Sequence, residues 1–122
     1  KETADNKLIV DAYNANPTSM MAALKNFRLI EAPHKMVILG DMKELGTVSH
    51  EEHQKVVDYL NECGFERVVL VGPEFAATTH TFQTFQNVDE VLADIQAHKP
   101  KGYYILVKGS NSMKLSLLPD QL

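Results

Sequence analysis

The feature that most constrains the fold is an alternation between short, continuous apolar runs and longer stretches with helical spacing. The apolar runs cover residues 8–10, 36–39, 68–71 and 103–107, and we expect a further short strand at 82–85. Apolar side chains recur every three or four residues over 17–31, 49–63 and about 87–100, as in amphipathic helices. Uninterrupted apolar strands are typical of parallel sheets with helices on both faces. We therefore predict an α/β, Rossmann-like three-layer α/β/α domain with a mostly parallel sheet of about five or six strands.

Local signals place several helix ends. Asn16 followed by Pro17 is the pattern of an N-cap and a first helical residue, and Gly64 is a typical stop for the helix over 49–63. A short helix is expected at 74–79. A final helix is expected from about residue 112 to 118, where Pro119 disturbs it.

Size and composition point to one globular domain. The chain has 122 residues and a formal net charge of −4, without a cluster of Lys and Arg, so nucleic acid is not an expected partner. Cys63 is the only cysteine, which excludes an internal disulfide and favours a cytoplasmic location. No apolar run reaches the ~20 residues of a membrane span. Because the chain opens on Lys1 rather than Met, we expect a domain cut from a longer protein.

Right-handed crossovers between parallel strands bring all strand-end loops to one edge of the sheet. Polar residues occupy four of these loops, at 11–16, 41–44, 72–74 and 108–111. Ligands of open α/β sheets bind at this edge. We expect the functional site there.

The first of these loops carries a carboxylate, a phenol and two amides. Asp11 suits the hydroxyl groups of a sugar, while Asn14 and Asn16 suit phosphate, adenine or peptide groups. A helix cap explains Asn16 and Pro17. It does not explain Asp11, Tyr13 and Asn14 together, so we predict a functional role for this loop.

Two further loops are open to two interpretations. Asp41 and Glu44, in the string GDMKELG over 40–46, suit a cation, a hydroxyl or a basic partner, but a solvated loop with turn glycines fits equally well. In the string KGSN over 108–111, Lys108 suits an anionic group, and Ser110 and Asn111 suit a carboxylate or an amide. A turn followed by a helix cap is an equal alternative.

Other chemistry finds little support. His50 and His53 flank two glutamates at a spacing of three rather than the four of a zinc helix, and no third ligand is evident, so we predict a polar surface helix and no metal. The chain lacks a phosphate-binding GxxxxGK[ST] loop, a GxGxxG turn and a GxSxG elbow. We therefore expect half of an active site rather than a self-sufficient one.

The first loop, the GDMKELG string, His53 and the KGS string with Met113 occur in an order and spacing that resemble the C-terminal domain of the Mur ligase family, over essentially the whole chain. The resemblance implies that residues 1–122 are the third domain of a three-domain enzyme. The first domain would bind a UDP-sugar, and the central domain would carry the phosphate loop and most contacts to ATP and Mg²⁺.

The implied reaction is an ATP-dependent ligation in peptidoglycan precursor synthesis, and thus in cell wall biogenesis, cell shape and cell division. D-alanyl-D-alanine would be joined to UDP-N-acetylmuramoyl-tripeptide through an acyl phosphate in the bacterial cytoplasm. This domain would close over ATP and help to place the dipeptide. We expect a monomer, and no ligase activity from the isolated domain.

The resemblance also implies residue roles, with no catalytic residue assigned to this chain. Asp11 would bind the ATP ribose. Asn111 stands where many relatives have Arg. The remaining roles are ATP-binding for Tyr13, Asn14 and Asn16, peptide- or dipeptide-binding for Lys108, Ser110 and Asn111, and rim structure or domain closure for Asp41, Glu44 and His53.

One rival is a phosphoacceptor receiver domain, which has a similar length, an Asp on the rim and a Lys after the last strand. However, a receiver needs an acidic pair after the first strand and an acceptor Asp after the third. Here Asp11 stands alone, and the third strand ends in Gly72-Pro73. A non-catalytic docking module is a further alternative.

Overall fold

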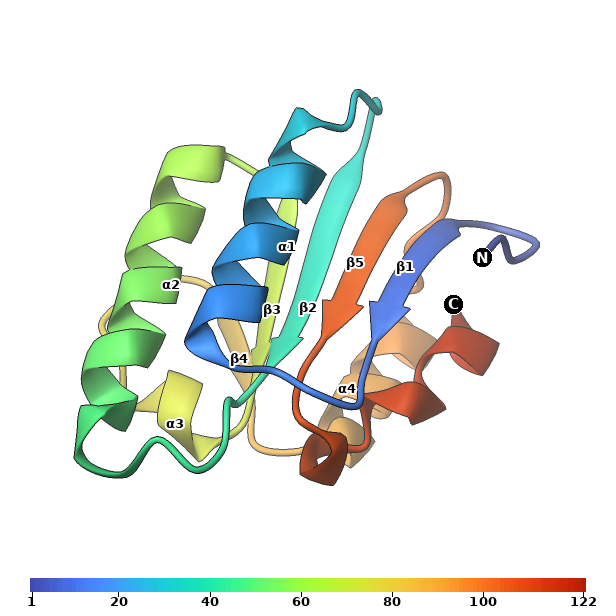
Figure 1. Ribbon diagram of the computed structural model, residues 1–122. Helices are drawn as coiled ribbons and strands as arrows, with labels where there is room; N and C mark the ends of the chain where they lie inside the picture. Colours follow the sequence, from blue (N-terminus) through green and yellow to red (C-terminus); the bar gives the residue numbers. More distant parts are fainter.

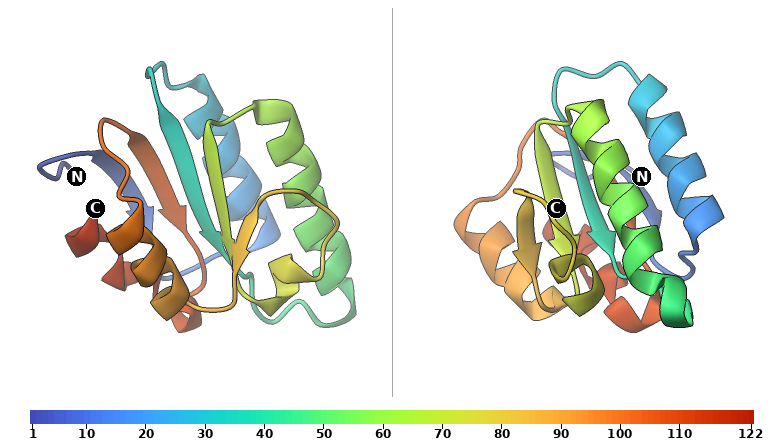
Figure 2. Two further views of the ribbon diagram at one scale, coloured as in Figure 1. Left: turned by 180° about the vertical axis from the view of Figure 1, so that it is seen from behind. Right: turned by 90° about the vertical axis from the view of Figure 1, so that its left-hand side faces the viewer.

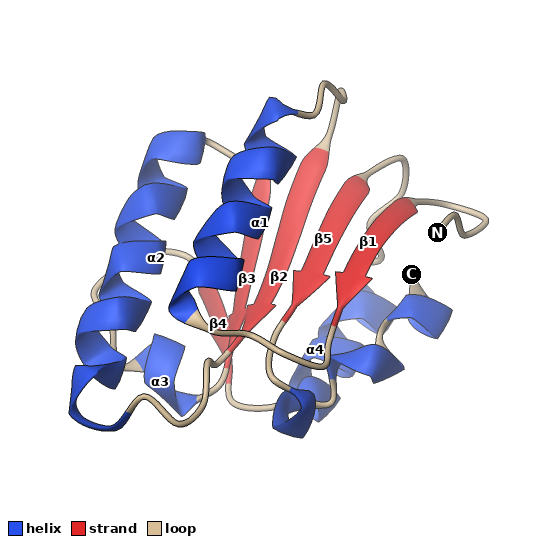
Figure 3. Cartoon of the chain, viewed as in Figure 1, coloured by secondary structure: helices blue, strands red, loops and turns tan.

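The computed structural model describes residues 1–122 and contains one parallel sheet between two layers of helix (Figures 1 and 3). The strands lie in the order β1-β5-β2-β3-β4, and every neighbouring pair is parallel. The predicted three-layer α/β fold is therefore confirmed, with five strands. Their bounds are β1 (Lys7–Asp11), β2 (Lys35–Gly40), β3 (Arg67–Val71), β4 (Gln83–Phe85) and β5 (Tyr104–Lys108).

Side chains of the central strands alternate between two apolar cores, because successive residues of a strand point to opposite faces. On one face, α1 (Pro17–Leu29), α2 (Ser49–Cys63) and α3 (Pro73–Ala76) cover Val37, Leu39 and Leu70. On the other face, α4 (Val88–Ala97) and the C-terminal segment cover Ile38 and Val69. Figure 2 shows α1 and α2 on the opposite side of the sheet from α4.

The predicted helix ends agree with the structure where a local cap was recognised. Asn16 precedes α1, and Pro17 is its first residue. Gly64 follows α2 with a φ of 67°, a left-handed conformation that glycine adopts without steric cost. The start of α4 was predicted only approximately, and the structure places Asn87 as its cap, accepting the backbone N–H of Glu90.

The first strand differs from its prediction as a buried strand. β1 is an edge strand paired only with β5, and both Ile9 and Val10 are 37% exposed. Figure 1 shows that no helix lies in front of β1 on the α1 side. A run of three apolar residues does not distinguish an edge strand from a central one, because the position of a strand in the sheet depends on the crossover connections.

The prediction of a C-terminal helix over 112–118 is wrong. Three separate 3₁₀ turns form instead, at Asn111–Met113, Leu115–Leu117 and Pro119–Gln121. Lys114 interrupts the segment with a φ of 58°, which an α-helix does not contain. Met113, Leu115 and Leu118 are buried against the sheet, and their spacing of two and three residues follows the core rather than a helical period.

The longest helix, α2, has 15 residues and many polar side chains. None of the helices has the length and apolarity that crossing a bilayer requires.

Candidate functional site at the carboxyl edge of the sheet

Asp11 and Lys108, which are 97 positions apart in the sequence, form an ion pair at the ends of β1 and β5. The two residues are register partners in the parallel pair, and Lys108 Nζ lies 2.7 Å from Asp11 Oδ2. The same ammonium donates to the backbone oxygen of Asn14 at 3.1 Å. The Lys108 side chain is 3% exposed and that of Asp11 is 48% exposed. Lys108 thus holds a carboxylate whose other side faces solvent.

The ammonium of Lys108, with lesser help from the backbone amides of Tyr13 and Asn14, lowers the pKa of Asp11 below its ordinary value. The carboxylate therefore stays ionised and remains a hydrogen-bond acceptor at neutral pH. Tyr13 is 75% exposed, and Asn14 is also exposed beside it. The loop thus offers a fixed carboxylate, a phenol and an amide to a ligand that approaches from outside.

Asn16 has a structural task that occupies its side-chain oxygen. That oxygen accepts the backbone N–H of Ser19 at 2.9 Å, and the Ser19 hydroxyl oxygen accepts the backbone N–H of Asn16 at 3.1 Å. This reciprocal arrangement is a capping box. The side-chain NH₂ of Asn16, on an exposed residue, is the group left for a ligand.

Asp41 is fully buried and fastens the loop after β3. Its carboxylate accepts the backbone N–H groups of Glu74 and Phe75, both at 2.9 Å, at the start of α3. Burial raises the pKa of Asp41, while these two bonds act in the opposite direction. Gly72 makes the approach possible, because a Cβ at that position would stand 2.3 Å from the Asp41 carboxylate. Asp41 therefore organises the rim from inside and has no free surface for a ligand.

The prediction of a polar surface helix is wrong for His53, which is fully buried and has a partner at each ring nitrogen. Nε2 accepts the backbone N–H of Met42 at 3.0 Å, and Nδ1–H donates to the backbone oxygen of Ser49 at 2.7 Å. Nε2 therefore carries no proton, and its 4.0 Å separation from Asp41 Oδ1 is not an ion pair. The hydroxyl of Ser49 donates to Glu74 at 2.6 Å. The network ties α2 to the loops after β2 and β3.

The remaining predicted residues lie at different depths of the same edge. Glu44 is exposed with a φ of 62°. Ser110 is buried, and its hydroxyl pairs with that of Ser112 at 3.2 Å. Asn111 is exposed at the start of the first of the three C-terminal 3₁₀ turns. Asp41 and His53 thus form a buried support, whereas Asp11, Tyr13, Asn14, Glu44 and Asn111 are the outward groups.

The steric role of Gly72 and the bonds of Ser49 and Glu74 were not anticipated from the sequence. The signal for Gly72 was its place before Pro73 at the end of a strand, which indicated only a turn. Ser49 and Glu74 carry no such signal, because their partners come from other parts of the chain. The structure contains no group of three or more His, Cys, Asp or Glu side chains that could hold a metal ion.

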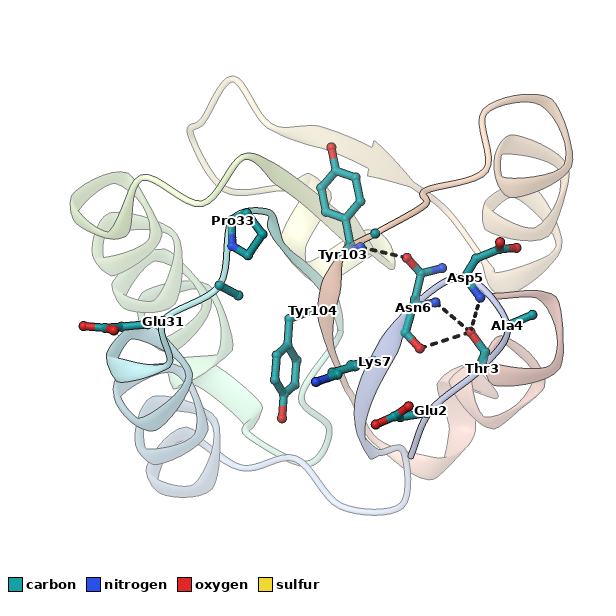
Figure 4. Close-up of a pocket in the computed structure, with 12 residues that line it drawn as sticks. Glu2, Thr3, Ala4, Asp5, Asn6, Lys7, Glu31, Pro33, Tyr103 and Tyr104 are labelled. Atoms are coloured by element: carbon teal, nitrogen blue, oxygen red, sulfur yellow. Dashed lines mark hydrogen bonds between the residues drawn. The ribbon is translucent and has the colours of Figure 1, made fainter.

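A hollow of about 410 Å³ lies away from these residues, at the amino ends of β1 and β5 (Figure 4). Its walls come from the segment before β1, the loop after α1, and Tyr103 and Tyr104. Asn6 is buried there and accepts the backbone N–H of Tyr103 at 3.0 Å. None of the predicted site residues lines it.

Residues 1–111 match the family described as "Mur ligase, glutamate ligase domain". This match covers most of the chain, and the chain belongs to this family.

Curated relatives narrow the comparison to one branch. The UDP-N-acetylmuramoyl-tripeptide–D-alanyl-D-alanine ligase of Rickettsia prowazekii is 34% identical over 95% of this chain and 27% of its own length. The ligase of the same name from Escherichia coli strain K12 is 35% identical over 91% of the chain and 26% of its own length. The chain therefore spans about a quarter of the curated relatives it matches.

Solved structures agree with this comparison. A MurF from Acinetobacter baumannii has a TM-score of 0.77 and 32% identity, over 100% of this chain and 28% of that one. The MurF ligase of Thermotoga maritima in complex with ADP has a TM-score of 0.81 over 99% of this chain and 29% of that one. At 22% identity the latter similarity shows the fold alone.

Proposed function

We propose that residues 1–122 are the C-terminal domain of an ATP-dependent ligase that joins D-alanyl-D-alanine to UDP-N-acetylmuramoyl-tripeptide in bacterial peptidoglycan synthesis. The observation that carries the proposal is the identity of about a third, over more than nine-tenths of the chain, to ligases of that name. The chain's own lack of a phosphate-binding loop agrees with a domain that completes a site on a neighbouring one.

In this proposal Asp11 binds the ribose hydroxyls of ATP. Its carboxylate is ionised, fixed by Lys108 and half exposed, which are the properties of an acceptor for two adjacent hydroxyl groups. Tyr13, Asn14 and the free NH₂ of Asn16 line the nucleotide beside it. The phosphates and Mg²⁺ are held mainly by the central domain of the full-length enzyme.

Closure of this domain over the central one excludes water. Water would hydrolyse an acyl phosphate, so exclusion protects the intermediate while the dipeptide amine is aligned for attack. The buried network of Asp41 and His53 supports the rim that closes. Asn111 faces the peptide substrate from this edge of the sheet, with the buried Ser110 beside it. The isolated chain accordingly has no ligase activity, and the full enzyme acts as a monomer in the cytoplasm.

The strand order argues against the receiver alternative. Doubly wound receivers have the order 2-1-3-4-5, with the first strand inside the sheet. Here β1 lies at the edge beside β5. An Asp at this edge and a Lys after the last strand are expected in both classes, but β3 is followed by Gly72 and Pro73, without an acceptor carboxylate.

The test is Asp11→Ala in the full-length ligase, with steady-state kinetics for each substrate. We expect the KM for ATP to rise about tenfold or more while the KM for the dipeptide stays within twofold, because only the ribose contact is lost. Asp120→Ala, which removes another exposed carboxylate, is the matched control. An unchanged KM for ATP would show that Asp11 does not bind the ribose. Turnover by the pure 122-residue chain would contradict the proposal that its site needs a second domain.

A further inference from the structure

A second hollow of about 460 Å³ lies at the same carboxyl edge, on the side of α4. Its walls come from the segments that follow β2, β3, β4 and β5, whereas the Asp11 loop follows β1. Two lysines, Lys43 and Lys114, line it together with polar and apolar residues. These further residues are Pro73, Gln86, Asn87, Val88, Asp89, Ser112, Met113 and Leu117.

Lys43 and Lys114 are free cations. Neither ammonium takes part in any ion pair or side-chain hydrogen bond of the structure, and both side chains belong to exposed residues. By contrast, Lys108 is buried, and its ammonium is already bonded to Asp11 and to the backbone of Asn14. An anionic substrate group at this rim therefore meets Lys43 and Lys114 more readily than Lys108.

The rest of the hollow suits a short peptide rather than a bare anion. Asn87 uses its side-chain oxygen to cap α4, which leaves its NH₂ to donate, and Ser112 has a hydroxyl at the same wall. Val88, Met113 and Leu117 supply the apolar part of the lining. Asp89 is the one carboxylate of the lining, so the two lysines leave the hollow with net positive charge. Its volume lies within the ~300–1,000 Å³ of small-molecule sites.

We infer that Lys43 and Lys114 bind the terminal carboxylate of the dipeptide acceptor in this hollow. The inference rests on the proposed function, which supplies D-alanyl-D-alanine as the acceptor. Charge-assisted hydrogen bonds from the two ammonium groups hold the carboxylate. Asn87 and Ser112 meet the peptide group, and the apolar wall receives the methyl groups. Lys108 then serves as a positioning residue for Asp11 and does not bind the acceptor, which lies in the hollow lined by Lys43 and Lys114.

The test compares the full-length ligase with its Lys43→Met and Lys114→Asn variants. Asparagine is chosen because Lys114 has a φ of 58°, which Asn tolerates well. The acceptors are D-alanyl-D-alanine and D-alanyl-D-alaninamide, which differ in the charge of the terminal group. Lys101→Met is the control, because Lys101 is an exposed lysine in the loop before β5, at the amino ends of the strands.

We expect the parent enzyme to prefer the dipeptide to its amide by about tenfold or more. Each variant should raise the KM for the dipeptide about tenfold, and should lose most of that preference. The KM for ATP should stay within twofold, and the melting temperature should stay close to that of the parent because both lysines are exposed. Lys101→Met should change none of these values.

Other outcomes separate the possible errors. A raised KM for ATP with an unchanged KM for the dipeptide would mean that the hollow receives a phosphate, and would overturn the inference. An unchanged preference for the dipeptide over its amide in both variants would overturn it as well. Absence of ligation by the parent enzyme itself would instead refute the proposed function.

Discussion

Replacement of Asp41 by alanine tests whether a buried carboxylate organises the rim. The carboxylate accepts two backbone N–H groups at 2.9 Å, from Glu74 and Phe75, and it is fully buried. In Asp41→Ala both donors lose their acceptor, and no other side-chain acceptor bonds to either of them. The Phe75 amide is buried, while that of Glu74 is partly accessible to water.

The expected loss of stability follows from these two donors. A buried donor without a partner costs about 1–3 kcal/mol, and a partly accessible one costs less because water replaces the carboxylate. Burial of the Asp41 carboxylate is itself unfavourable and raises its pKa. Its removal therefore offsets part of this cost. We therefore expect the free energy of unfolding to fall by about 2–4 kcal/mol, which for a chain of this size lowers Tm by roughly 8–16 °C.

Urea and thermal unfolding of the 122-residue chain, followed by circular dichroism, measure this loss. Glu44→Ala is the matched control, because Glu44 lies in the same loop but is exposed, and its effect should stay within about 0.5 kcal/mol. The loss of unfolding free energy in Asp41→Asn should lie between those of Asp41→Ala and Glu44→Ala, since one amide oxygen replaces two carboxylate oxygens. Hydrogen exchange at the Phe75 amide should accelerate in Asp41→Ala. A change below about 0.5 kcal/mol in Asp41→Ala would refute the reasoning.

Two further predictions concern the same edge of the sheet. Gly72→Ala should destabilise the chain by at least about 2 kcal/mol in urea unfolding, because the new Cβ would stand 2.3 Å from the Asp41 carboxylate at a φ of 118°; stability equal to that of the parent would show that the loop moves freely. Carbon-detected NMR should give Asp11 a pKa below that of an unfolded chain, and Lys108→Met should move this pKa upward, because the ammonium is its main cause. Because the pKa of Asp11 is lower in the folded state, the ion pair stabilises the fold at pH values above the unfolded pKa of about 3.9, and this stabilisation is lost as the pH falls through the folded pKa. The contribution should be below ~1 kcal/mol, because Asp11 is half exposed. An unchanged pKa of Asp11 in Lys108→Met would contradict the pairing.

The sequence determined the elements whose signals are local. Apolar runs gave β2, β3 and β5 within a residue or two, and Gly64 and Asn16 marked helix ends through backbone preferences that need no distant partner. The parallel arrangement followed as well, because strands joined through helices must cross over in one direction. The same crossovers place the polar loops at a single edge of the sheet.

Tertiary structure alone decided which of these polar groups face a ligand. Lys108 and Asp11 are both polar residues at strand ends, but one is buried and the other is half exposed because β1 lies at the edge beside β5. Asp41 turns inward because α3 brings two N–H groups to it, although its sequence context resembles that of exposed Glu44. The C-terminal segment breaks into short turns because the sheet beneath it, rather than helical spacing, sets which side chains are buried. Which side chains are buried or exposed depends on contacts between residues far apart in the chain, whereas periodicity and capping patterns depend only on residues close in sequence.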